Sequence, residues 1–97
     1  MPYFGQGGAF VDRSGTIAAG GVAQTLAAVN TSRSFIQVFN ASTGDLWINW
    51  TTAAVVGQPS MKIPANTLYE SAPNALSTEL ISIIGATTGQ AFSAKEL

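Results

Sequence analysis

From about residue 22 onward, the chain alternates short apolar runs with clusters of turn-forming residues. Clear examples of these clusters are residues 30–32, 41–45 and 57–60, which together are rich in Asn, Ser, Gly and Pro. Such residues favour turns because they supply the required backbone angles and local hydrogen bonds. Short strands separated by frequent turns are typical of sandwiches and closed barrels. We therefore expect an all-β fold: a single small antiparallel β-sandwich or barrel.

Seven segments of the sequence have the length and composition of strands. One of them also fits a helix, because Val22, Leu26 and Val29 are spaced as i, i+4 and i+7, but we predict a strand there. The Gly-containing segment 84–90 is typical of a hairpin bend between the last two strands. The predicted strands span residues 22–29, 35–40, 46–50, 61–63, 68–71, 80–84 and 91–95.

Residues 1–21 differ from the rest of the chain because they hold six of its ten glycines. Glycine at this density resists fixed structure, since ordering its backbone costs more entropy than for other residues. Tyr3, Phe4 and Phe10 argue against a merely solvated tail. We predict an extended Gly-rich N-terminal arm at 1–21 that docks on a neighbouring subunit, followed by a sandwich domain at 22–97. The alternative is a disordered or self-packing terminus.

Alternation along the strands separates core positions from surface positions. Leu46, Ile48 and Trp50 share one face of their predicted strand, and we assign that face to the core. Trp47 lies on the opposite face among polar neighbours, which predicts a position at the edge of the sandwich or in an interface.

Two segments, 35–39 and 80–84, are apolar on both faces. In an antiparallel sandwich, one face of each sheet normally meets water. Apolar residues on both faces therefore favour a contact between subunits over a solitary monomer. A barrel with a few exposed aliphatic residues is the alternative.

The composition leaves few groups for chemistry. Among 97 residues there are four Lys and Arg, five Asp and Glu, and no His or Cys, so only 9% are charged while 46% are hydrophobic. Soluble domains have about 25% charged residues. Disulfides are excluded, and a zinc or iron site is disfavoured. Since a domain of this size is often only marginally stable alone, we expect a homo-oligomer, with no cofactor.

The formal net charge of −1 supplies no basic surface for phosphates or anionic lipids, so we expect neither nucleic acid nor a membrane as partner. Several glycines, together with Asp12 and Arg13, interrupt any apolar stretch near the N-terminus that could serve as a secretion signal or membrane span. We therefore expect synthesis in the cytoplasm without export.

Enzymatic activity is not expected. Without histidine, a Ser or Thr nucleophile has only Lys62, Lys95 or the terminal amine for activation, and neither lysine lies in a recognisable catalytic motif. The five acidic residues could be paired for glycoside hydrolysis, but their positions single out no pair. A calcium site through Asp45 lacks the usual run of alternating Asp and Asn ligands.

Three stretches of the chain resemble a known group of proteins: SFIQVFNASTGDLWINW (34–50), MKIPANTLYES (61–71) and ELISIIGATTGQAFSAKEL (79–97). They resemble small all-β virion proteins of tailed bacteriophages, several of which decorate or cement the capsid. The similar features are an aliphatic strand ending in Asn, a D-L-W-I-N strand, an I-P-A turn leading to Tyr69-Glu70, and the I-S-I-I-G-A-T-T-G-Q segment. The resemblance covers about residues 20–97.

This resemblance implies a jelly-roll-like or related β-sandwich that binds the major capsid protein from outside, as a dimer or trimer on the virion surface. Such a protein would bridge neighbouring capsomers and stabilise the shell. One alternative is a tail or fibre adaptor. Another is a carbohydrate-binding receptor module, in which the two tryptophans and Tyr69 stack on a sugar. Our candidate interface residues are Tyr3, Phe4, Phe10, Trp47, Trp50 and Tyr69.

Overall fold

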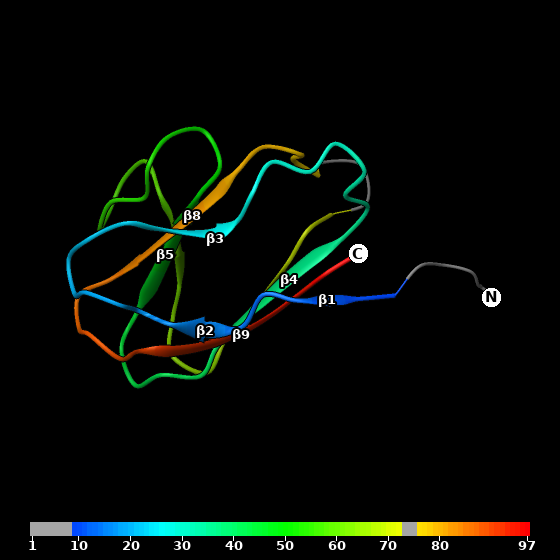
Figure 1. The fold of residues 1–97 in the computed structure, drawn as a ribbon. Helices are drawn as coiled ribbons and strands as arrows, with labels where there is room; N and C mark the ends of the chain where they lie inside the picture. Colours follow the sequence, from blue (N-terminus) through cyan, green and yellow to red (C-terminus); the bar gives the residue numbers. More distant parts are fainter. Residues whose placement is uncertain (1–8, 73–75) are drawn as a thin grey trace.

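A computed structural model describes residues 9–72 and 76–97 of the chain. These residues form nine β-strands and no helix. The strands make two antiparallel sheets that pack face to face (Figure 1), which confirms the predicted all-β sandwich. The strands are β1 (Val11–Asp12), β2 (Gly15–Thr16), β3 (Gln24–Ala27), β4 (Ile36–Asn40), β5 (Leu46–Asn49), β6 (Met61–Ile63), β7 (Leu68–Glu70), β8 (Ile81–Gly85) and β9 (Ala91–Glu96).

The two sheets contain strands from widely separated parts of the chain. The five-stranded sheet has the order β1-β9-β4-β7, and β2 also pairs with β9. The four-stranded sheet has the order β3-β8-β5-β6. Consecutive strands therefore often lie in different sheets, and β4 and β5 are joined by a connection that crosses from one sheet to the other.

The core lies between the sheets and follows the alternation of the strands. On β4, Ile36 and Val38 point inward, and on β5, Leu46 and Ile48 do the same. Burying one such side chain contributes about 1.5–3 kcal/mol, which makes this layer the main source of stability. The buried apolar cluster consists of Ile17, Leu26, Ala27, Ile36, Val38, Leu46, Ile48, Ile63, Ile81, Ile83, Phe92 and Ala94.

Each of the seven predicted strand segments overlaps one observed strand, from β3 to β9. The segment that also fitted a helix is strand β3, because its backbone pairs with β8. The register of this pair shifts between Thr25 and Ala27, so the strand contains a bulge. This irregularity lets both Leu26 and Ala27 be buried, which a regular alternation would not allow.

The predicted hairpin at 84–90 is wrong, because β8 and β9 belong to different sheets. The connection between them hydrogen-bonds to an N-terminal segment instead. Ile17 N donates to the Gln90 carbonyl, Gly89 N donates to the Ile17 carbonyl, and Gly21 N donates to the Gly85 carbonyl. The turn-forming residues of segment 84–90 therefore form a connection that crosses from one sheet to the other.

The sandwich begins earlier than the predicted boundary between residues 21 and 22. Strands β1 and β2 pair with β9, and Ile17 is part of the core. Pairing satisfies backbone groups along the outer side of β9, which would otherwise be an open sheet edge. Tyr3 and Phe4 lie outside the described residues.

Candidate functional site

The outer face of the four-stranded sheet is partly covered by the chain itself. Segment 51–60 folds against this face, and Ala54 N donates a 2.9 Å hydrogen bond to Ser82 Oγ. Ala54 is buried, and so is Ile84, which points outward from the same strand as Ser82. The second apolar face of β8 is therefore sheltered within one subunit.

The outer face of the five-stranded sheet carries aromatic side chains. Phe35 and Phe39 alternate with the buried positions of β4 and are half-buried. Phe10 is 56% exposed, and its ring meets Phe35 edge to face, with 6.1 Å between ring centroids. Leu68 pairs with Phe39 in the β4–β7 register and is 47% exposed. We call the surface made by Phe10, Phe35, Phe39 and Leu68 the aromatic face.

A row of polar side chains crosses the aromatic face between Phe35 and Phe39. Its centre is Gln37 on β4, which pairs with Lys95 on β9 and with Glu70 on β7. Lys95 Nζ lies 2.9 Å from Asp12 Oδ1. Hydrogen bonds from Ser14 and Lys95 hold the pKa of Asp12 well below its ordinary value, so this carboxylate is charged at neutral pH. Glu70 forms no ion pair with any residue in the described ranges.

A second group of charged residues, the arginine–glutamate cluster, consists of the buried Arg33 and Glu96 and of Arg13, whose side chain is 37% exposed. The side chains of Arg33 and Glu96 are only 0% and 1% exposed. Glu96 accepts hydrogen bonds of 2.6 Å from Arg33 Nε and 2.9 Å from Arg13 Nε. Burial raises the pKa of Glu96, but the hydrogen bonds from the two arginines outweigh it, and the pKa lies below its ordinary value.

The cluster holds separate parts of the chain together. Arg33 Nη1 donates to the carbonyls of Ser77 and Glu79, and Nη2 donates to the carbonyl of Ala28. Each bond joins a connecting segment to β9 through Glu96. Because these N–H groups of Arg33 all donate to acceptors within the chain, we infer that the arginine–glutamate cluster stabilises the fold. No short motif in the sequence marks it, since Arg33 and Glu96 are 63 positions apart.

The structure separates the two tryptophans that the sequence placed on opposite faces. Trp47 lies on the outer face of the four-stranded sheet, where Lys62 Nζ is 5.7 Å from its ring centroid. Trp50 instead packs against the core and against Tyr69, with ring centroids 5.9 Å apart. Burial raises the pKa of Tyr69. Trp50 and Tyr69 are therefore together, but no platform combines them with Trp47.

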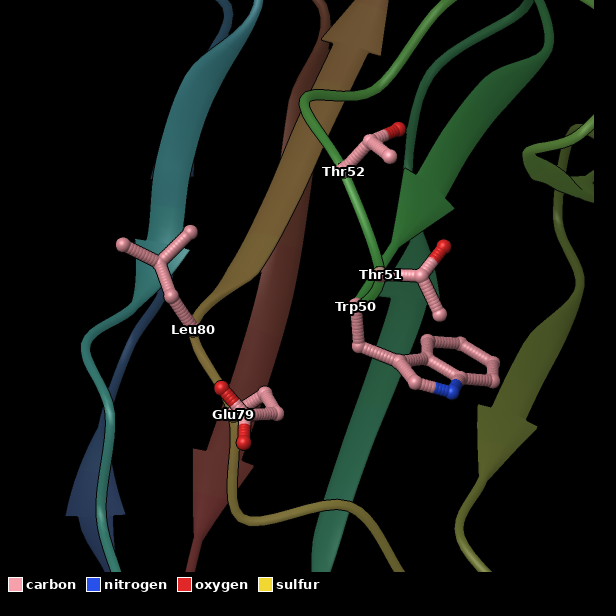
Figure 2. A pocket seen from close by; sticks show the side chains of 5 residues that line it. All are labelled: Trp50, Thr51, Thr52, Glu79 and Leu80. Atoms are coloured by element: carbon pink, nitrogen blue, oxygen red, sulfur yellow. The ribbon is translucent and has the colours of Figure 1, made fainter.

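A surface hollow of about 150 Å³ lies where β5 and β8 diverge (Figure 2). Trp50, Thr51, Thr52, Glu79 and Leu80 line it. The Trp50 indole and the Leu80 side chain extend in opposite directions, so the lining side chains do not converge on one point. The hollow therefore lacks the convergent polar groups that fix a small ligand in a binding site.

Residues 9–72 and 76–97 contain no group of three or more acidic residues positioned to hold a metal ion. Within the same ranges, no helix is long and apolar enough to cross a membrane. Comparisons of the chain with protein-family models, with curated proteins and with solved structures found no match.

Proposed function

We propose that this chain is a non-enzymatic structural subunit that assembles through the aromatic face. The observation that carries the proposal is the grouping of Phe10, Phe35, Phe39 and Leu68 on one face, where Phe10 is 56% and Leu68 is 47% exposed. The outer face of the four-stranded sheet is partly covered by segment 51–60, although Val55 and Val56 of that segment and Met61 of β6 are also exposed. Exposed apolar surface that is grouped on one face is typical of interaction sites.

For the kind of assembly, we propose capsid decoration in a tailed bacteriophage. The support is the resemblance of stretches 34–50, 61–71 and 79–97 to small virion proteins. These stretches contain β4 to β9, so they include every strand of the sandwich except β1, β2 and β3. The proposed partner is the major capsid protein, and the proposed location is the outer surface of the virion.

Decoration would stabilise the shell by linkage. A subunit that binds the assembled lattice, and not its separated components, shifts the equilibrium towards the lattice. This role needs a rigid domain and a contact surface. The sandwich supplies rigidity through its apolar core and the buried arginine–glutamate cluster. It needs no catalytic group, in keeping with a chain that has neither His nor Cys.

The number of copies per virion tests this proposal. In purified particles that carry this chain, quantitative gel analysis is expected to give a copy number comparable with that of the major capsid protein. Electron cryomicroscopy is expected to place the protein on the outer shell. On the order of a dozen copies or fewer at one vertex would replace decoration with a tail or fibre role. Absence from purified particles would overturn both assignments.

A further inference from the structure

The charges on the aromatic face are arranged asymmetrically about β4. Lys95 lies on one side of Gln37 and Glu70 lies on the other, in the same row. Because neighbouring strands are about 4.8 Å apart, these two side chains stand roughly 10 Å from each other. Glu70 has no ionic partner among the described residues, and it is exposed.

Two simple symmetric arrangements of a second copy on this face have the two-fold axis along β4 or across it, and the charges distinguish them. A two-fold axis along β4 places the β9 side of one copy over the β7 side of the other. Lys95 then faces Glu70 of the second copy twice, while each Phe39 faces its equivalent. A two-fold axis that lies in the plane of the sheet and perpendicular to β4 instead places Lys95 over Lys95, its ion-pair partner Asp12 over Asp12, and Glu70 over Glu70. Like charges facing each other destabilise an interface, so the first arrangement is favoured.

We propose that a second copy of this chain covers the aromatic face, with the two-fold axis along β4 and Lys95 opposite Glu70 of the second copy. The inference rests on the proposed function, because it assigns the aromatic face to the contact between two copies and leaves the other surfaces of the sandwich for the proposed major capsid protein. Phe35 and Phe39 would form the apolar centre of the contact, since they lie on the axis. The two Lys95–Glu70 pairs would flank it and fix the register.

The size of the face predicts a weak dimer. Five residues of β4 extend about 17 Å, and the four strands of the path span about 14 Å across. The resulting area of roughly 240 Å² is well below the 800 Å² or so per partner of a standard stable interface. We therefore expect a dissociation constant between about 10 µM and 1 mM for the free protein.

Analytical ultracentrifugation of the full chain over this concentration range tests the inference. The wild-type protein is expected to sediment as a monomer–dimer equilibrium. Lys95→Glu replaces two attractive pairs by two repulsive ones and should weaken association at least about tenfold. The double variant Lys95→Glu/Glu70→Lys recreates both attractive pairs with reversed signs and should recover most of the loss.

A matched control is available on the other sheet. Lys62 is exposed to a similar degree as Lys95 and also lies near an aspartate, Asp45, at 3.8 Å. Lys62→Glu changes the net charge by the same amount and should leave the dissociation constant unchanged. Thermal unfolding of each variant at low protein concentration verifies that the fold is retained.

Specific outcomes overturn the inference. A wild-type protein that stays monomeric up to about 1 mM contradicts it. Equal dimerisation of the wild-type, Lys95→Glu and double variants also contradicts it, because it rules out the charge pairing. Either result leaves the virion copy number unaffected, so decoration by a monomer would still stand. A charge-dependent dimer that is absent from virions would instead remove the proposed function and keep the interface.

Discussion

Replacing Glu96 by Gln tests whether the arginine–glutamate cluster stabilises the sandwich. The substitution keeps the shape of the side chain but removes its negative charge. Arg33 would then be a buried cation whose side chain is 0% exposed and whose partner can no longer balance its charge. Arg13 would also lose its 2.9 Å ion pair. We expect the free energy of unfolding to fall sharply.

The magnitude follows from burial. Removing one partner of a buried ion pair typically costs about 3–5 kcal/mol. The total stability of a domain is only about 5–15 kcal/mol, so this single change removes a large part of it. In a domain of fewer than 100 residues, about 3 kcal/mol corresponds to a decrease in Tm of roughly 12–24 °C.

Urea unfolding followed by tryptophan fluorescence measures this effect, and calorimetry gives the shift in Tm. Glu70→Gln is the matched control, because it removes the same charge from an exposed position and should change stability by less than about 0.5 kcal/mol. If Glu96→Gln and Glu70→Gln unfold at the same urea concentration with equal slopes, the buried cluster does not stabilise the fold as we infer.

Two further predictions concern the pH dependence of stability and the side-chain hydrogen bonds of Gln90. Because the pKa of Glu96 is lowered in the folded chain, its stabilising contribution is present above the unfolded pKa of about 4.3 and is lost as pH falls through the folded value. The difference in the free energy of unfolding between wild type and Glu96→Gln should therefore decrease from about pH 5 downward. A difference that stays constant with pH contradicts this prediction. Gln90→Ala removes bonds to the Asp45 carbonyl, Ser42 Oγ and Thr87 N. It should lower the free energy of urea unfolding by about 1–3 kcal/mol, and an unchanged midpoint contradicts this.

The strands of the core could be predicted because their side chains alternate strongly. Ile36 and Val38 are buried while Phe35 and Phe39 are partly exposed, as expected for a period of two. The short strands β1 and β2 carry no such signal. Each has two residues, and Gly15 in β2 is a residue type depleted in strands. These two strands pair with the backbone groups along the side of β9 that faces away from β4. That edge exists only once the sheet has formed, so local sequence does not reveal it.

Contacts between distant residues explain why the connection at 84–90 was predicted incorrectly. The Gly and Thr residues there fit a hairpin equally well as a crossing between sheets. The choice depends on Gln90, whose buried side chain bonds to Ser42 and Asp45, more than 40 positions away in sequence. Local turn chemistry cannot reveal such a partner, just as it cannot reveal the pairing of Arg33 with Glu96.

Most of the few charged side chains of this chain pair with one another in the fold. Three of them make the arginine–glutamate cluster, and Asp12–Lys95 and Asp45–Lys62 are ion pairs on the surface. Among the described residues, this leaves Glu70 and Glu79 without an ionic partner. Glu70 is the one of these two that lies on the aromatic face, in the same row as Lys95. Where so few charges are available, one unpaired carboxylate is enough to decide in which orientation a second copy fits.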